Sequence, residues 1–278
     1  MRIAVTGAGG GLGSALVARA AAEHDVVGFG HEDLSVEDRR AVLGLIREAA
    51  PDVVVHLAAM TAVDACEEDP DRALAVNAYG TANVADAARE TGALLLYTST
   101  DYVFDGEKEE PYVESDAPNP LSAYGRSKLA GEDEVRLRAP EYQVVRTGWL
   151  FGGGDDFFSR AVRGLTVGES VGGIVDRTGT PTYVPHLASG LVALLASGLR
   201  GLVHLAGPEP TSWFDLLVRA RGLGALPGEL TEQKSADLDL AASRPRNSAL
   251  ASEVLPVPGV AQLPHLDEAL GAMLEGIR

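Results

Sequence analysis

Short runs of valine, leucine and isoleucine recur along the first half of the chain and alternate with longer amphipathic stretches. The runs RIAVTG, DVVGFG, DVVVHLAA, ALLLYTS and YQVVRTGWLFG show little polar alternation, which is typical of strands buried on both faces. Between them, stretches such as LGSALVARAAAE and VEDRRAVLGLIREAA predict helices. Because strands of this kind joined by helices build parallel βαβ units, the sequence predicts an α/β protein with a doubly wound parallel sheet of the Rossmann type.

Beyond residue 150 the pattern becomes less regular, and glycine and proline break it into short pieces. A strand expected near 171–175 and the helix that follows it would still extend the sheet. The many prolines toward the C-terminus indicate a loop-rich region, as an appended substrate-binding region often is. We therefore expect a dinucleotide-binding Rossmann domain and a smaller C-terminal substrate-binding lobe, made respectively of 1–148 plus about 171–205 and of 149–170 plus 206–278.

Composition and charge exclude several kinds of partner. The formal net charge of −17 at pH 7 argues against a nucleic acid or an anionic membrane, because the field of the protein repels both polyanions. A single cysteine, Cys66, leaves no internal disulfide, which fits a reducing cytoplasm. No apolar run approaches the ~18 residues of a membrane span, and the N-terminus begins with a strand rather than a leader. We predict a soluble cytoplasmic protein, and the six scattered histidines predict no metal site.

The segment TGAGGGLG lies between the first predicted strand and the first predicted helix. This context is what the phosphate-binding fingerprint of dinucleotide folds requires. The glycines allow a tight turn and a close approach of the main chain to a pyrophosphate, and the helix N-terminus carries roughly half a positive charge. The segment therefore predicts a dinucleotide cofactor held at Gly7, Gly10 and Gly13.

The second predicted strand ends in GFGHEDLS. Gly30 stands where folds that choose NAD usually place an acid for the ribose 2′-hydroxyl. Without a carboxylate at that position a 2′-phosphate is not repelled, so both NADPH and NADH are predicted, with NADPH slightly preferred. His31 is a candidate for contact with the phosphate, and Asp33 is a candidate for contact with the adenosine.

The motif AYGRSK puts Tyr124 and Lys128 four residues apart on a predicted helix, hence on one face. An unperturbed tyrosine has a pKa of ~10, and a neighbouring ammonium is expected to lower that pKa and make the phenol a usable acid. The strand ALLLYTS leads into Ser99 and Thr100, and strands of such folds end at the edge where ligands bind. We predict that a hydroxyl there bonds a substrate oxygen while Tyr124 transfers a proton.

These blocks together resemble the extended short-chain dehydrogenase/reductases and, within them, the dTDP-4-dehydrorhamnose reductases. The resemblance runs through GAGGGLG, HLAAMTAVDACEEDPDRALAVNA, STDYVFDG, PLSAYGRSKLAGE, VVRTGWLFG, DRTGTPT and SRPRNSAL. It implies a catalytic trio of Thr100, Tyr124 and Lys128. It implies a cofactor site that also includes Gly11, Leu12, Leu34, Ala58, Ala59, Met60 and Thr61. The sugar contacts expected from it are Tyr102 and Trp149, next to Thr100 and Asp101.

The resemblance also implies the reaction, which is hydride transfer from NADPH or NADH to the C4 ketone of a nucleotide-linked 6-deoxyhexose, with dTDP as the expected carrier. Tyr124 would give a proton to the forming alkoxide, Lys128 would hold the nicotinamide ribose, and Thr100 would polarise the carbonyl. Asp101 is expected to orient this cluster. Independently of the resemblance, Arg244 and Arg246 in SRPRNSAL are candidates to grip the diphosphate, because they are cations in an otherwise acidic protein. Relatives commonly dimerise, and the sequence itself leaves the choice between a monomer and a homodimer open.

Three alternatives stay open. A nucleotide-sugar 4,6-dehydratase has the same fold, but such enzymes carry a glutamate where this chain has Tyr102. An epimerase needs the same tyrosine and lysine and keeps its cofactor tightly bound. A regulatory subunit resembling that of methionine adenosyltransferase would bind cofactor without turnover, and the retained trio weakens that interpretation.

Overall fold

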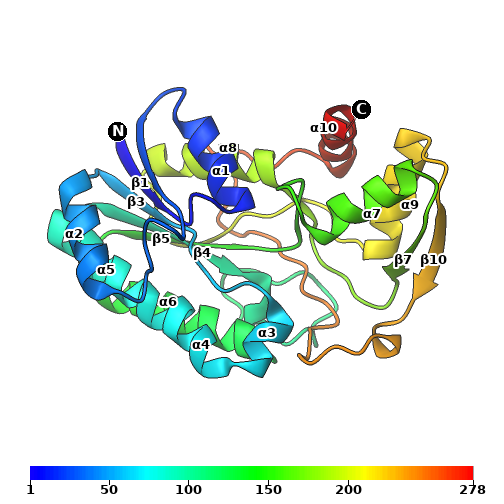
Figure 1. The fold of residues 1–278 in the computed structure, drawn as a ribbon, viewed down its shortest axis with the longest axis horizontal. Helices are drawn as coiled ribbons and strands as arrows, with labels where there is room; N and C mark the ends of the chain where they lie inside the picture. The colour runs from blue at the N-terminus through cyan, green and yellow to red at the C-terminus, as the bar shows by residue number, and fades with distance from the viewer. Residues whose placement is uncertain (278) are drawn as a thin grey trace.

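A six-stranded parallel sheet forms the centre of the protein, which we describe from a computed structural model covering residues 1–277 (Figure 1). Every neighbouring pair of strands in this sheet runs parallel. The order β2-β1-β3-β4-β5-β9 is that of a doubly wound sheet, so the predicted fold class is confirmed. The strands are β1 (Arg2–Thr6), β2 (Asp25–Phe29), β3 (Val53–His56), β4 (Leu94–Thr100), β5 (Tyr142–Thr147) and β9 (Gly201–His204).

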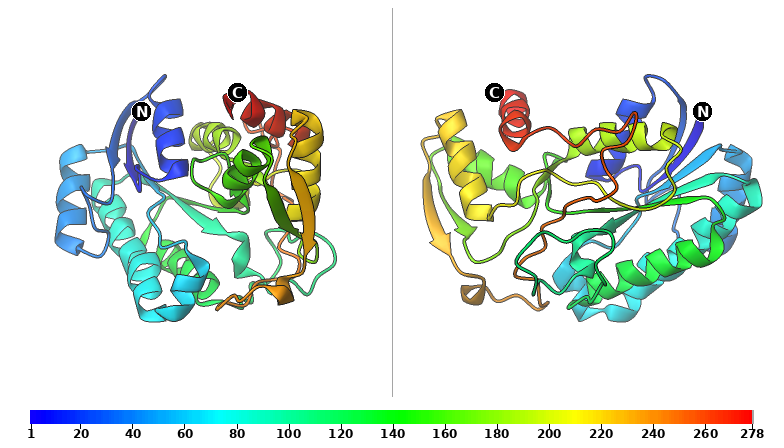
Figure 2. Two further views of the ribbon diagram at one scale, coloured as in Figure 1. Left: turned by 45° about the vertical axis from the view of Figure 1, so that its right-hand side comes forward. Right: turned by 180° about the vertical axis from the view of Figure 1, so that it is seen from behind.

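Helices cover both faces of the sheet (Figures 1 and 2). On one face α1 (Gly11–Ala20) packs against α8 (Val184–Ala196). On the other face α2 (Arg39–Ala49), α5 (Gly80–Thr91) and α6 (Ala123–Arg138) lie side by side. Successive residues of a strand point to opposite faces, and both faces are buried here. The strands therefore lack the polar alternation of a half-exposed sheet, as the sequence indicated.

Two apolar cores result from this alternation. Val53 and Val55 of β3 join the core under α1 and α8, whereas Val54 between them joins the core under α2, α5 and α6. Polar caps fix where the surrounding helices begin. Asp38 accepts hydrogen bonds from the main-chain amides at the start of α2. Ser122 does the same for α6, where it accepts from the amide of Gly125.

A smaller lobe with its own core lies beside the sheet (Figure 1). Its elements are β6 (Leu150–Phe151), α7 (Phe157–Thr166), β7 (Ser170–Ile174), β8 (Thr182–Tyr183), α9 (Trp213–Gly224), β10 (Glu229–Gln233) and α10 (Leu266–Ile277). After β10 the chain returns from the lobe toward the large sheet (Figure 2). We call residues 238–250 of this returning segment the strap. Bridges Tyr112↔Leu250 and Thr178↔Asn247 hold the strap against both parts of the molecule.

The strand expected near 171–175 exists as β7, but the expectation that it extends the large sheet is wrong. β7 pairs with β10 in a separate two-stranded sheet, and β9 supplies the sixth strand of the large one. The reason lies in the preceding helix, α7, because it buries Phe158, Val162 and Leu165 in the core of the lobe. The strand that follows α7 is thereby held in the lobe, and the chain returns to the large sheet only at α8.

No helix within residues 1–277 is both long and apolar enough to cross a membrane.

Candidate active site

The polar cluster at the end of β4 lies at the carboxyl edge of the sheet, between β3 and β5. Ser99, Thr100 and Asp101 are buried, and Tyr102 is half-buried at the start of a short 3₁₀ turn, η2 (Asp101–Val103). The main-chain amide of Tyr102 donates to Oγ1 of Thr100 at 3.2 Å, which fixes that hydroxyl at the turn. This edge is where ligands bind in open parallel sheets, so the cluster is correctly placed to meet one.

Helix α6 brings the tyrosine and lysine of the AYGRSK motif to the same edge. The ring of Tyr124 meets the ring of Tyr102 edge to face, with centroids 6.0 Å apart. Thr100 lies near enough to the Tyr124 phenol to affect its ionisation. One turn further along, Nζ of Lys128 lies over the ring of Tyr97, 4.2 Å from its centroid. The structure therefore brings Thr100, Tyr102 and Tyr124 together, with Lys128 deeper in the same helix face.

Burial dominates the ionisation of these groups. It raises the pKa of Tyr124 above the ordinary 10, and a hydrogen bond with Thr100 opposes the rise. Burial also lowers the pKa of Lys128 from 10.5 to about 7, against the opposing charge of Glu132. The predicted lowering of the tyrosine pKa by lysine is therefore wrong for this structure. Burial disfavours the charged form of Lys128, and desolvation of the phenol is the largest influence on the pKa of Tyr124.

A buried ion pair connects α6 to β5. Arg146 of β5 donates two hydrogen bonds of 2.8 Å to the two carboxylate oxygens of Glu132. The arginine is 1% exposed and the glutamate is fully buried. Since Glu132 follows Lys128 by one turn, this pair fixes the helix face that carries the candidate catalytic groups.

The glycine turn after β1 is as close-packed as a dinucleotide site requires. Gly7 has a positive φ of 73°, and a Cβ atom added there would lie 2.6 Å from the amide nitrogen of Ala58. At Gly11 an added Cβ would lie 2.4 Å from the carbonyl oxygen of Gly153. Gly10 caps α1 without a side-chain hydrogen bond. Because the N-cap residue is a glycine, no side chain at that position occupies the first main-chain amides of α1, as expected for a helix that receives a pyrophosphate. Leu12 and Gly13 continue the same turn of α1.

The end of β2 carries a carboxylate in spite of Gly30. Asp33 folds back, and its Oδ2 accepts from the main-chain amide of Gly30 at 2.8 Å. A Cβ atom at Gly30 would lie 3.3 Å from the same oxygen. His31 is exposed beside it, and Leu34 is buried in the core under α2. Asp33, three residues after Gly30, therefore places a carboxylate at the end of β2, where Gly30 itself provides none.

The loop after β3 contains the predicted residues 58–61 and is held by a residue that the sequence analysis missed. Asn77 is fully buried in a short π-helical segment, η1 (Ala75–Tyr79). Its side chain accepts from the amide of Met60 at 2.8 Å and donates to the carbonyl of Met60 at 3.0 Å. It also donates to Ser127 of α6 at 2.9 Å. Asn77 therefore connects the predicted cofactor loop to the helix that carries Tyr124. Short π-helical segments are frequent at functional sites.

Aromatic and basic side chains from the lobe and the strap form one wall of the candidate site. Trp149 has a positive φ of 50° and stacks on Trp213 with centroids 4.4 Å apart. Its Nε1 donates to the hydroxyl of Ser248 in the strap at 3.2 Å. Arg244, also in the strap, makes a two-pronged ion pair with Asp64, with bonds of 2.8 and 2.6 Å.

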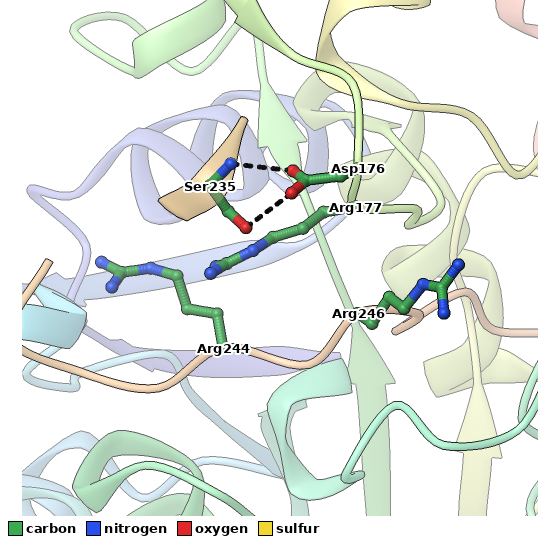
Figure 3. Close-up of a pocket in the computed structure, with 5 residues that line it drawn as sticks. All are labelled: Asp176, Arg177, Ser235, Arg244 and Arg246. Atoms are coloured by element: carbon green, nitrogen blue, oxygen red, sulfur yellow. Dashed lines mark hydrogen bonds between the residues drawn. The ribbon is translucent and has the colours of Figure 1, made fainter. Parts of the chain in front are cut away.

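A pocket of about 370 Å³ opens beside this wall and is lined by Asp176, Arg177, Ser235, Arg244 and Arg246 (Figure 3). Arg177 extends toward Arg244, whereas Arg246 points to the other side. Nη1 of Arg177 is buried and has no hydrogen-bond partner among residues 1–277. Both guanidinium groups act on the ionisation of Tyr102, so the pocket adjoins the Tyr102–Tyr124 pair. Arg177 was missed from the sequence, although the block DRTGTPT that contains it was noted.

The fold and the site together define a class of protein. A doubly wound sheet with a glycine turn after β1, and with Thr100, Tyr124 and Lys128 at its carboxyl edge, is the arrangement expected of the extended short-chain dehydrogenase/reductases. The chain belongs to the family described as RmlD substrate binding domain, whose model matches residues 1–278. The family predicted from the sequence motifs is therefore confirmed.

Known relatives match over nearly their full length. The chain is 40% identical to the dTDP-4-dehydrorhamnose reductase of Mycobacterium tuberculosis, over 98% of this chain and 92% of that protein. It matches a solved dTDP-4-dehydrorhamnose reductase of Clostridium acetobutylicum with a TM-score of 0.95 and 34% identity, covering 100% and 99% of the two chains. It matches the dTDP-4-dehydrorhamnose reductase of Bacillus anthracis, solved in complex with NADP, with a TM-score of 0.94 and 32% identity, covering 99% of each.

Proposed function

We propose that this protein is an NAD(P)H-dependent oxidoreductase that reduces the 4-keto group of a nucleotide-activated 6-deoxy sugar, with dTDP as the carrier, in deoxysugar biosynthesis. The single observation that carries the proposal is the meeting of Thr100, Tyr102 and Tyr124 at the carboxyl edge of β4. Relatives with the same blocks are named dTDP-4-dehydrorhamnose reductase.

The residues around the glycine turn fit a dinucleotide. We assign the pyrophosphate to the turn and to the start of α1, the adenosine ribose to the end of β2, and the nicotinamide half to the loop after β3. Bound NADPH or NADH supplies the hydride. The proposed contacts are Gly7, Gly10, Gly11, Leu12 and Gly13, then His31, Asp33 and Leu34, and finally Ala58, Ala59, Met60, Thr61, Tyr124 and Lys128.

The proton is proposed to come from Tyr124. A phenol with a raised pKa still gives its proton readily to an alkoxide, because an alkoxide is a stronger base than a phenolate. Thr100 is proposed to donate a hydrogen bond to the ketone oxygen as negative charge develops there. Lys128 is proposed to hold the nicotinamide ribose, and a bound anion nearby would favour the charged form of its amine.

The diphosphate is proposed to lie at the two arginines beside Tyr102. Arg244 was predicted for this role, but its guanidinium is already paired with Asp64. Arg177 lines the same pocket and carries a buried N–H group without a partner in the described chain (Figure 3). Two like charges held side by side in a protein of net charge −17 favour an anionic ligand between them. We therefore assign Arg177 as the main contact and Arg244 as its neighbour.

The remaining expectations are carried forward as part of this proposal. The large sheet with its helices forms the dinucleotide domain, and the lobe, now including β7, selects the sugar with Trp149 as one wall. The protein is proposed to act in the cytoplasm as a homodimer, without a nucleic-acid or membrane partner. Its buried single cysteine and acidic surface are in keeping with that setting.

A turnover screen tests the function. Purified protein is incubated with dTDP-, UDP-, GDP- and CDP-linked 4-keto-6-deoxy sugars and with NADH or NADPH, and cofactor oxidation is followed by absorbance. The proposal expects oxidation with the dTDP sugar. Purified protein carrying a full complement of oxidised cofactor would favour an epimerase instead. Cofactor binding without turnover of any sugar, together with a stable protein partner, would favour a regulatory subunit.

A further inference from the structure

Asp101 is a buried carboxyl at the centre of the candidate active site. Its side chain is 2% exposed. Gly148 lies so close that a Cβ atom added there would come within 2.5 Å of the carboxyl carbon. The hydroxyl of Ser248 in the strap also lies close enough to act on the Asp101 carboxyl. Asp101 is thus enclosed by protein, and Thr100 is the polar neighbour to which it is hydrogen-bonded.

The hydrogen bonds of Thr100 decide what its hydroxyl can do. A hydroxyl has one proton to donate and two lone pairs that accept. In the structure Oγ1 of Thr100 accepts from the amide of Tyr102 at 3.2 Å and donates to Oδ1 of Asp101 at 3.1 Å. With an ionised Asp101 the proton of Thr100 is therefore committed to the carboxylate. No proton is then left for a ketone oxygen.

The surroundings of Asp101 disfavour the ionised form. Oδ2 is buried and makes no well-formed hydrogen bond among residues 1–277, although the Ser248 hydroxyl lies close enough to act on the carboxyl. The titratable groups that face it are Tyr102 from its own turn and Tyr124 from α6, both of which are neutral at pH 7. The end of β5 and the strap present only Gly148 and Ser248. Burial raises the pKa of Asp101 from 3.8 to about 7, with the hydroxyls of Ser248 and Thr100 opposing the rise.

We propose that Asp101 is a positioning residue that works in its neutral form: its carboxyl O–H donates to Oγ1 of Thr100 and so directs the Thr100 proton to the substrate carbonyl. This inference rests on the proposed function as a ketoreductase. In this state Oγ1 of Thr100 accepts from Tyr102 N–H and from Asp101 and donates to the ketone, and the bound ketone oxygen replaces the contact between Thr100 and the Tyr124 phenol. Proton delivery to the alkoxide stays with Tyr124, and Asp101 loses no proton to the product.

The proposal predicts the direction in which kcat/KM changes with pH. The protonated carboxyl is the active form, so kcat/KM is full below the pKa of Asp101 and falls as the pH rises through it. With titration at about 7, the neutral fraction falls about thirtyfold between pH 6 and pH 8.5. The wild-type kcat/KM for the keto sugar is expected to follow that fall.

Asp101→Asn tests the direction of the hydrogen bond. The amide N–H₂ donates at every pH, so kcat/KM of Asp101→Asn for the keto sugar is expected to change less than threefold between pH 6 and pH 8.5. Wild type and variant are compared at saturating cofactor, so that the bound anion keeps Lys128 charged in both. Thr100→Val is the matched variant, because without the hydroxyl there is nothing to direct. In the Thr100→Val background, adding Asp101→Asn should leave the pH profile unchanged. A thirtyfold fall that persists in Asp101→Asn would overturn the proposal, as would an Asp101→Asn variant whose rate drops at pH 6 to that of Thr100→Val.

A second measurement does not depend on the substrate. Carbon-13 NMR of aspartate-labelled protein follows the carboxyl signals with pH, and the signal missing from Asp101→Asn identifies Asp101. A midpoint near 7 supports the proposal, and a midpoint below 5 overturns it. If no keto sugar is turned over by the wild type, the proposed function fails, and this titration still decides whether Asp101 is neutral at pH 7.

Discussion

The buried pair of Glu132 and Arg146 gives the sharpest test of how the site is supported. Arg146 is 1% exposed, and both partners are held by two hydrogen bonds of 2.8 Å. Arg136 adds a third contact to the glutamate at 2.7 Å. Glu132→Gln keeps the shape of the side chain and removes its charge. The variant therefore leaves the Arg146 guanidinium buried without a counter-charge.

The expected loss is large for one substitution. Removing one partner of a buried pair costs about 3–5 kcal/mol of unfolding free energy. For a chain of this size each kcal/mol lowers Tm by about 2–4 °C, so a decrease on the order of 10 °C is expected. Glu134→Gln on the outer face of the same helix is the control. Its partly exposed pair with Arg138 is worth about 0–1 kcal/mol.

Urea unfolding of the three proteins measures the difference. Hydrogen bonds and charge from Arg146 hold the pKa of Glu132 below its usual 4.5, although burial alone would raise it. A carboxyl with a lowered folded pKa stabilises above 4.5 and loses that stabilisation as the pH falls through the folded value. The gap between wild type and Glu132→Gln should therefore narrow in acid. A loss at pH 7 no greater than that of Glu134→Gln would refute the reasoning.

Three further variants test the ligand sites. Gly11→Ala places a methyl group 2.4 Å from the carbonyl oxygen of Gly153 and should weaken cofactor binding at least tenfold in a fluorescence titration. The control Gly44→Ala, which has nothing within 4 Å of its added methyl group, should bind cofactor with wild-type affinity. Equal affinities of the two variants would contradict the assignment. Asp33→Asn removes the carboxylate at the end of β2 and should raise the ratio of kcat/KM for NADPH to that for NADH about tenfold; an unchanged ratio would place the ribose elsewhere. Arg177→Gln should raise KM for the sugar nucleotide at least tenfold with little change in kcat, and a KM equal to wild type would remove the diphosphate from this pocket.

The fold could be predicted because the signal for it is local. Residues such as Val54 and Val55 both belong to buried cores, so an unbroken apolar run directly indicates a two-sided strand. The glycine turn and the end of β4 also carry their chemistry within a few consecutive residues. Which strand pairs with which is not encoded in a few consecutive residues, and for that reason the prediction that β7 extends the large sheet was wrong.

The parts of the site that were missed depend on contacts between distant segments. Asn77 is an ordinary polar residue in a helical stretch until the fold brings it to Met60 and Ser127. Its one local signal was an amide side chain in the middle of an apolar helical face. Arg177 becomes part of a pocket only because the strap, more than sixty residues later in the chain, brings Arg244 beside it. The ionisation of Tyr124 was predicted with the wrong sign because burial cannot be judged from spacing along a helix.

The central claim is that the phenol of Tyr124 protonates the oxygen of the reduced ketone. Tyr124→Phe keeps the ring beside Tyr102 and removes the hydroxyl, so the most direct measurement is kcat of this variant together with its cofactor Kd. The account predicts a fall in kcat of about 100- to 10,000-fold, the usual contribution of a positioned acid, with the cofactor Kd within about threefold of wild type. A variant that turned over the keto sugar at the wild-type rate would contradict it.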